Sequence, residues 1–242
     1  MPTVETLVEQ QCYLIRNALS PKEQIDLFQD VLNQSQETDN SPKRCMNPSP
    51  KTIIFDGNRS TIHYELLHND RDDRRDDNGM DVFNKMIQTV NKCLFRDGGN
   101  NNNNDVMELQ HNHFPTFNHL SVGVIRYPVP DGNFPEHCDH CKNSWVYLLS
   151  LGCTATFVVY NKETMDEKLS FGMQSGDVLV FDASTEASII HGVKNIQPNT
   201  CPRELLDMLV DDDTTSSSLL LQNHRFGVQC RVRYRKKGEK EG

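Results

Sequence analysis

The stretch that decides the fold is residues 175–193, which read SGDVLVFDASTEASIIHGV. Ser175-Gly176-Asp177 is a turn signal, and the apolar run that follows it, Asp177–Phe181, has the length and composition of a buried strand. A second apolar run, Ala187–His191, ends at a histidine. Two short apolar segments separated by polar residues predict a β-rich fold at this point of the chain.

The same pattern of short β-rich segments extends in both directions from this stretch. Further strands are expected at Ser121–Tyr127, Trp145–Leu151, Ala155–Tyr160, Leu169–Met173 and Phe226–Tyr234. Regular spacing of such segments between turn signals is typical of an all-β sandwich or jelly roll. We therefore predict a mostly β fold with some helix, in which a double-stranded β-helix occupies residues 111–236.

The first 110 residues carry helical signals. Ser20-Pro21-Lys22-Glu23 is a capping-box pattern with proline at the first helical position, so we expect a helix from about Pro21 to Leu32. Apolar residues at helical spacing from Met80 to Leu94 predict a second helix that packs one face on a core. We expect residues 1–110 to form a helical layer within the same domain.

Three parts of the chain are expected to differ from these regular helices and strands. Residues 44–64, with a short strand at Lys51–Phe55, are a candidate lid for substrate recognition. Residues 237–242 are expected to be a disordered basic tail. The excursion between His191 and Arg225, with its Asp- and Ser-rich stretch, is expected to be a mobile surface loop without chemistry.

Composition excludes several classes of protein. The chain has 242 residues, 36% of them hydrophobic, and fits one elaborated domain. With a mean hydropathy of −0.63 it has no apolar run near the roughly 20 residues that span a bilayer, so we expect no membrane anchor. The N-terminus does not read as a secretory signal, and the eight cysteines are scattered. We expect an intracellular monomer with mostly reduced thiols.

The charge balance bears on the partner. A formal net charge of −9 disfavours a broad electrostatic grip on nucleic acid, which normally needs a basic surface. Local basic patches remain available at Lys43-Arg44 and across Arg231–Lys237. Charge alone therefore leaves both nucleic acid and protein open as substrates.

Three residues form a candidate metal site. His137 and Asp139 are two apart, so on an extended segment both side chains point to the same face. His191 follows at the end of a predicted strand. Two histidines and one carboxylate make the facial triad of non-heme Fe(II) oxygenases, which leaves coordination positions open for co-substrate and O2. We interpret His137, Asp139 and His191 as the metal ligands and catalytic centre.

Two other metal interpretations are possible from the residues alone. Cys138 and Cys141 have the spacing of a structural zinc pair, although no partner pair stands at a useful distance. His111 and His113 could also bind a metal, but no third ligand accompanies them, and a solvated polar loop explains them better.

An arginine pair marks a candidate co-substrate site. Arg225 and Arg231 are six residues apart on a predicted strand, so they lie on the same face. A buried arginine can bind a carboxylate with two parallel hydrogen bonds, which suits a dicarboxylate.

Taken together, these motifs resemble the AlkB family of 2-oxoglutarate dioxygenases over about residues 117–234. The matching motifs are Arg126-Tyr127, His137-x-Asp139, His191, and Arg225 six residues before Arg231. The resemblance implies that Fe(II), 2-oxoglutarate and O2 are the cofactors. It implies that Arg225 binds the distal carboxylate of 2-oxoglutarate, that Tyr127 hydrogen-bonds the co-substrate, and that Arg231 supports the site near the metal.

The same resemblance implies a reaction: oxidative demethylation of N-alkylated bases in DNA or RNA, as in DNA repair, with the base flipped into the pocket. Phe181 and Trp145 are candidate stacking residues. Several positions depart from the family, because Ile125 and Gly227 replace usual asparagines, Cys141 replaces a frequent acidic residue and Ala187 a usual arginine. Two alternatives therefore stay open: an enzyme of the same iron chemistry acting on protein side chains, and a non-catalytic binding module on a dioxygenase fold.

Overall fold

The protein is described by a computed structural model that covers residues 1–36, 51–55, 59–64, 81–94, 119–164, 168–210 and 215–233. Its strands are β1 (Thr3–Val8), β2 (Cys12–Arg16), β3 (Lys51–Phe55), β4 (Arg59–Tyr64), β5 (His119–Pro128), β6 (Phe134–Cys138), β7 (Ser144–Gly152), β8 (Ala155–Asn161), β9 (Leu169–Met173), β10 (Val178–Asp182), β11 (Ile189–Ile196) and β12 (His224–Arg233). Its helices are α1 (Pro21–Gln36), α2 (Asp81–Leu94), α3 (Arg203–Val210) and α4 (Thr215–Asn223).

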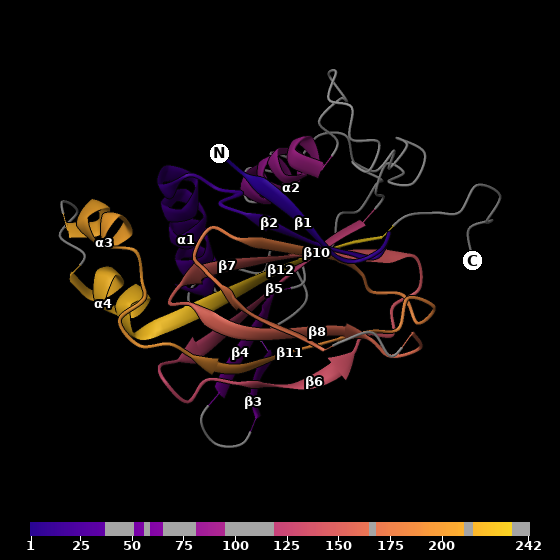
Figure 1. The fold of residues 1–242 in the computed structure, drawn as a ribbon. Coiled ribbons are helices and arrows are strands. Elements are labelled where there is room, and N and C mark those ends of the chain that lie inside the picture. The colour runs from indigo at the N-terminus through magenta and orange to yellow at the C-terminus, as the bar shows by residue number, and fades with distance from the viewer. Residues whose placement is uncertain are drawn as a thin grey trace.

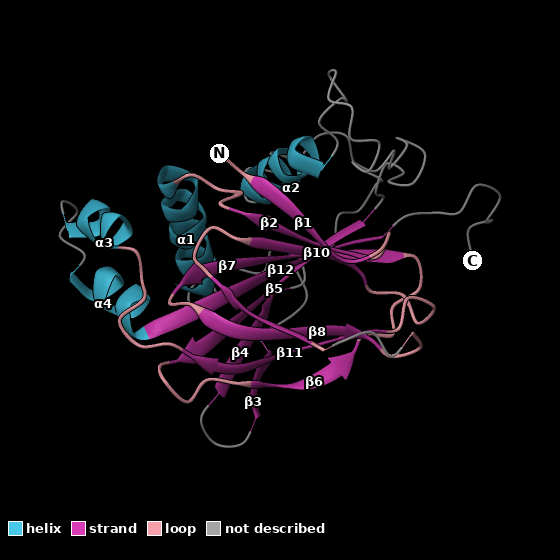
Figure 2. Ribbon diagram, in the orientation of Figure 1, coloured by secondary structure: helices cyan, strands magenta, loops and turns pink. Residues whose placement is uncertain are grey.

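The strands form two antiparallel sheets (Figure 1). The major sheet has the order β1-β2-β10-β7-β12-β5-β4-β3, and the minor sheet has the order β6-β11-β8-β9. Helices lie on the side of the major sheet that faces away from the minor sheet (Figure 2). This architecture is a jelly roll with flanking helices, so the predicted mostly β fold is confirmed.

The central strands β7 and β10 of the major sheet are buried on both faces, which explains their long apolar runs. Along β10, Val178 and Val180 join a core cluster that also contains the apolar faces of α1 and α2. Leu179 and Phe181 point the other way, into the cluster between the two sheets. Because successive side chains of a strand alternate between faces, a strand with two buried faces reads as a continuous apolar run.

The N-terminal layer is less helical than we predicted. The structure confirms α1 with its capping box, in which the Ser20 amide donates to Glu23 Oε2 at 2.8 Å, and it confirms α2. The first sixteen residues, however, form β1 and β2, and β2 pairs with β10 in the major sheet. Of the candidate lid, β3 and β4 extend the other edge of this sheet, whereas residues 44–50 lie outside the described residues, as does the tail 237–242.

The excursion after β11 contains two helices, so the predicted surface loop is wrong for the described residues 203–210 and 215–223. Leu205 and Leu209 of α3 and Leu221 of α4 are at most 2% exposed and belong to the cluster that α1 shares with the major sheet. Leucines four apart on a short helix cover one face. The chain therefore buries part of this segment against the core. In the described part of the chain, no helix is long and apolar enough to cross a membrane.

Candidate metal and co-substrate site

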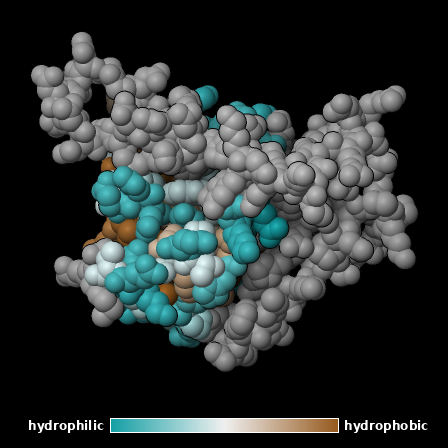
Figure 3. Space-filling model, turned by 90° about the vertical axis from the view of Figure 1, so that its right-hand side faces the viewer, coloured by the Kyte–Doolittle hydropathy of each residue, from teal (hydrophilic) through white to brown (hydrophobic). Residues whose placement is uncertain are grey.

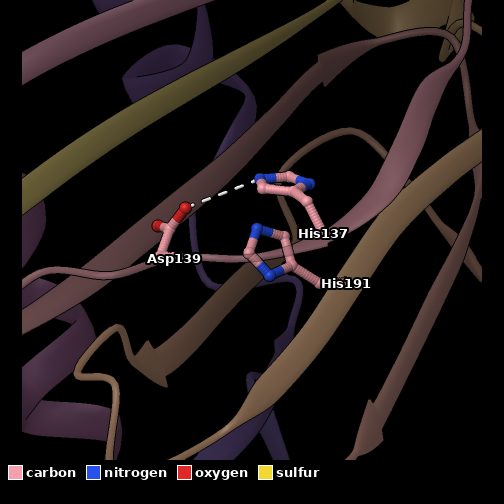
Figure 4. A group of neighbouring side chains, drawn as sticks. All are labelled: His137, Asp139 and His191. Carbon is pink, nitrogen blue, oxygen red and sulfur yellow. Dashed lines mark ion pairs between the residues drawn. The ribbon is translucent and has the colours of Figure 1, made fainter.

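The three candidate metal ligands meet at one end of the minor sheet. His137 lies near the end of β6, Asp139 directly follows that strand, and His191 on the neighbouring β11 is paired with His137 in the register of the two strands. One ligand atom from each side chain lies within 4.8 Å of the others. Figure 4 shows the two rings and the carboxylate facing a common point. Strand pairing thus brings together residues that are far apart in the sequence.

His137 is held with one ring nitrogen directed at this point. Its Nδ1 lies 3.0 Å from the Pro135 carbonyl oxygen, so Nδ1 carries the proton and donates it there. Its Nε2 faces the Asp139 carboxylate, 3.5 Å from Oδ1. Burial lowers the pKa of His137, but the hydrogen bonds to Asp139 and to the Pro135 carbonyl outweigh burial, and the net pKa is raised.

His191 is the most deeply buried of the three ligands, at 5% exposure. Burial, together with the nearby His137, lowers the pKa of His191 to about 4. The imidazole is therefore neutral at physiological pH, which is the form that binds a metal. Phe181 packs against the ring with 4.5 Å between centroids and helps to exclude water from it.

Asp139 is oriented by contacts on both of its oxygens. Oδ1 faces His137, and Oδ2 accepts a hydrogen bond of 2.8 Å from Nη2 of Arg231, which comes from β12 of the major sheet. Burial raises the pKa of Asp139. The hydrogen bond with His137 and the charge of Arg231 lower it by more than burial raises it, so the net pKa lies below its ordinary value. The carboxylate remains ionised and available as a ligand.

Arg225 is fully buried and forms no salt bridge with any of the described residues. Its Nε donates to Ser150 Oγ at 3.1 Å, and its Nη2 contacts Met173 Sδ at 3.5 Å. Its Nη1 is buried without a hydrogen-bond partner. The Tyr127 ring, opposite Arg225 in the β5–β12 register, lies 5.3 Å from the guanidinium carbon. No carboxylate in the described part of the chain forms a salt bridge with this guanidinium, and a buried unpaired charge is costly.

The donor sets fit the cofactors predicted from the sequence. Two imidazoles and an ionised carboxylate match the facial triad that suits Fe(II). A buried guanidinium with an unused N–H suits the distal carboxylate of a dicarboxylate. Among the described residues, His137, Asp139 and His191 are the only group of three or more potential ligands within reach of one another.

The zinc alternative receives no support from the described residues. Cys138 Sγ contacts the Asp139 carbonyl oxygen at 3.3 Å, and Cys141 Sγ contacts Arg231 Nη1, so neither thiol joins a ligand group. The His111 and His113 pair lies outside the described residues.

The two aromatic candidates for base stacking are core residues. Trp145 is 6% exposed and stacks on Tyr13, with 6.5 Å between ring centroids, in the cluster on the helical side of the major sheet. Phe181 is 0% exposed and packs on His191. Neither offers a free face to a base.

Figure 3 views the end of the molecule at which β6 ends, and the described residues visible there are mostly hydrophilic.

The sequence did not single out Ser150 and Met173 as partners of Arg225. Ser150 stands within Ser150-Leu151-Gly152, which resembles the AlkB family, and that motif could have drawn attention to it. Met173 carries no such signal. Its contact with Arg225 arises only because β9 and β12, in different sheets, face each other across the core.

The fold and the gathered side chains define a class, the jelly-roll metal-dependent oxygenases. Within this class, a model of the 2OG-Fe(II) oxygenase superfamily matches residues 11–235. The chain belongs to this superfamily. The predicted family of oxygenases is thereby confirmed; Fe(II), 2-oxoglutarate and O2 are the cofactors of this superfamily, and the donor set described above fits them.

Individual relatives place the chain near AlkB-like proteins, as the sequence motifs predicted. The Arabidopsis thaliana DNA N(6)-methyladenine demethylase ALKBH1D is 40% identical over 62 residues, which are 26% of this chain and 14% of that protein. The solved structure of OsALKBH1 is 23% identical, with a TM-score of 0.53 over 95% of this chain and all of that one. A Trichoplax adhaerens prolyl hydroxylase, solved with a peptide of hypoxia inducible factor, is 14% identical with a TM-score of 0.51, covering 93% and 84% of the two chains. The two structural likenesses show the fold alone.

Proposed function

We propose that this protein removes alkyl groups from nitrogen atoms of bases in DNA or RNA, with Fe(II) held by His137, Asp139 and His191. The observation that carries the proposal is that these three ligand atoms lie within 4.8 Å of one another, and that one of them belongs to an ionised carboxylate held by Arg231. Fe(II) with 2-oxoglutarate and O2 supplies the hydroxylation of a C–H bond, and hydroxylation of an N-methyl carbon leads to release of formaldehyde.

The protein side chains prepare this chemistry. Arg225, whose Nη1 is unpaired, binds the distal carboxylate of 2-oxoglutarate, and Tyr127 lines the same pocket with its ring beside the guanidinium. Arg231 fixes one oxygen of Asp139 and leaves the other directed at the metal position. Phe181 keeps the inner side of the site dry.

The choice of nucleic acid as substrate rests on the similarity to the Arabidopsis thaliana DNA N(6)-methyladenine demethylase. Because the matched segment covers only 14% of that relative, the substrate of this chain needs its own test. The rival is an enzyme with the same iron chemistry that hydroxylates or demethylates a protein side chain. Its support is the net charge of −9, which does not favour a polyanionic substrate.

The test is succinate formation from 2-oxoglutarate with Fe(II) and ascorbate, in the presence of a panel of methylated and unmethylated oligonucleotides. Asp139→Ala is the blank, and Asp207→Ala, which removes an exposed carboxylate on α3, is the matched control. We expect a methylated oligonucleotide to stimulate the wild type and Asp207→Ala but not Asp139→Ala. Stimulation by peptides alone would support the rival, and succinate formation that survives Asp139→Ala would overturn the metal assignment.

A further inference from the structure

The side chain of Cys141 lies against Arg231, the arginine that orients Asp139. Arg231 donates from Nη1 to Cys141 Sγ and from Nη2 to Asp139 Oδ2, the latter at 2.8 Å. A guanidinium is planar and rigid, so the direction of one terminal nitrogen fixes the direction of the other. The sulfur at position 141 therefore bears on the geometry of the hydrogen bond to Asp139.

The backbone of Cys141 is anchored at both of its polar groups. Its N–H donates to the Ala183 carbonyl oxygen at 3.0 Å, directly after β10, and its carbonyl oxygen accepts a hydrogen bond of 3.3 Å from Ser144 Oγ at the start of β7. The Ala183 N–H in turn donates to the Ser144 carbonyl oxygen at 3.0 Å. Two strands of the major sheet thus fix the point from which the thiol projects.

Arg231 is held by two contacts from the loop that follows β6. In the described part of the chain, the hydrogen-bond partners of its guanidinium are Asp139 and Cys141. Its side chain is 20% exposed, so the protein does not enclose it fully, and its stem is long and flexible. With the sulfur removed, the head group could turn about its one hydrogen bond to Asp139.

We propose that Cys141 is a positioning residue for metal binding: it holds Arg231 so that Nη2 binds Asp139 Oδ2 and Oδ1 stays directed at the metal position. The inference rests on the proposed role of Asp139 as a ligand. It assigns the thiol to the arginine and not to the metal, in agreement with the ligand group found among the described residues, which does not contain Cys141.

The experiment measures Mn(II) binding to the metal-free protein by calorimetry, for the wild type, Cys141→Ala and Cys141→Ser. We expect the Kd to rise about fivefold in Cys141→Ala, which is less than the loss on removing a partner of a metal ligand outright, because Arg231 itself remains. A serine hydroxyl also accepts a hydrogen bond from a guanidinium, so Cys141→Ser should bind within about twofold of the wild type. A Cys141→Ser variant as weak as Cys141→Ala would overturn the proposal.

Cys138→Ala is the matched control. It removes a thiol from the same part of the chain, but this thiol contacts the Asp139 carbonyl oxygen, at 3.3 Å, and not Arg231. We expect this variant to bind Mn(II) like the wild type, and all the metal-free proteins to melt at the same temperature. Equal rises of the Kd in Cys138→Ala and Cys141→Ala would show that the loop as a whole, and not the contact with Arg231, governs metal affinity.

A double-mutant cycle tests whether Cys141 acts through Arg231. In the Arg231→Met background the thiol has no guanidinium to hold, so adding Cys141→Ala should change the Kd for Mn(II) by less than about twofold. Two effects that simply multiply would overturn the proposal, because Cys141 would then act on the site by another route.

Asp139→Ala separates failure of this inference from failure of the site assignment. Loss of Mn(II) binding in Asp139→Ala together with a wild-type Kd in Cys141→Ala would overturn the role of Cys141 and leave the site assignment intact. Wild-type affinity in Asp139→Ala would overturn the assignment itself.

Discussion

Asp139 depends on a residue from the opposite sheet for its orientation. Arg231 Nη2 holds Oδ2 at 2.8 Å and its charge keeps the pKa of Asp139 low. Partners of metal ligands fix ligand geometry, and their removal typically costs about 10- to 100-fold in metal affinity. We therefore predict that Arg231→Met weakens Mn(II) binding by about this factor, measured by calorimetry on the metal-free protein.

Arg233→Met is the matched control for this prediction, because it removes the same charge from the same strand at an exposed position. It should bind Mn(II) like the wild type. Equal losses in the two variants would show that net charge, and not the contact with Asp139, governs metal affinity.

The candidate site could be predicted from the sequence wherever close spacing along an extended segment sets the geometry. His137 and Asp139 are two apart and Arg225 and Arg231 six apart, so alternation alone puts each pair on one face. The partners of Arg225 could not be predicted in this way. Met173 meets it from another sheet, and contacts of that kind depend on topology that no local pattern carries.

At the scale of elements, α3 tests whether the excursion after β11 is part of the core. Leu209 is 1% exposed, whereas its neighbour Met208 is 40% exposed. Truncating a buried leucine to alanine costs about 2–5 kcal/mol of stability. We predict that Leu209→Ala lowers the free energy of unfolding in urea by an amount in this range, and that Met208→Ala changes it by less than about 0.5 kcal/mol. An unchanged free energy of unfolding in Leu209→Ala would mean that α3 does not pack against the core.

The junction of α4 and β12 should make stability depend on pH. His224 is partly buried, its Nδ1 lies 3.0 Å from the Leu220 carbonyl oxygen, and burial lowers its pKa. A lowered folded-state pKa means that the unfolded chain takes up the proton first as pH falls. The free energy of unfolding should therefore decrease as pH falls below about 6.5, the ordinary value for histidine.

Urea unfolding of the metal-free protein at a series of pH values measures this effect. His224→Gln should show a shallower pH dependence, with the remaining slope of the same sign coming from His191, whose pKa is about 4. An unchanged slope in His224→Gln would contradict the prediction.

Elements with uniform patterns were predictable, and those with mixed patterns were not. The apolar runs of β7, β8 and β10 reflect burial on both faces, and all three strands were expected to within about two residues. In contrast, β1 alternates weakly because it is an edge strand with mostly exposed residues. The buried leucines of α3 stand next to an acidic and serine-rich stretch, whose composition is typical of a loop.

For the whole molecule, the N-terminal strands matter to the fold although they carry no candidate site residue. Cys12, Tyr13, Leu14 and Ile15 on β2 are at most 2% exposed, and β2 covers the edge of β10. Each buried side chain of this size contributes about 1.5–3 kcal/mol, and a domain is stable by only about 5–15 kcal/mol in all. We predict that a protein without residues 1–16 shows no cooperative thermal unfolding when its unfolding is followed by circular dichroism.

Deleting only residues 1 and 2, which precede β1, is the control and should leave that transition in place. A truncated protein that lacks residues 1–16 and still melts cooperatively would show that the major sheet is complete without β1 and β2.

The contact between Arg231 and Asp139 also joins the two sheets, since one residue lies on the major sheet and the other follows a strand of the minor sheet. Ligands that bind the native state oppose every opening that would separate their contacts. If Asp139 and both histidines hold a metal, as proposed, that metal also closes this end of the jelly roll. We then expect resistance to proteases to follow metal supply, so that iron scarcity would shorten the lifetime of the protein as well as slow its chemistry.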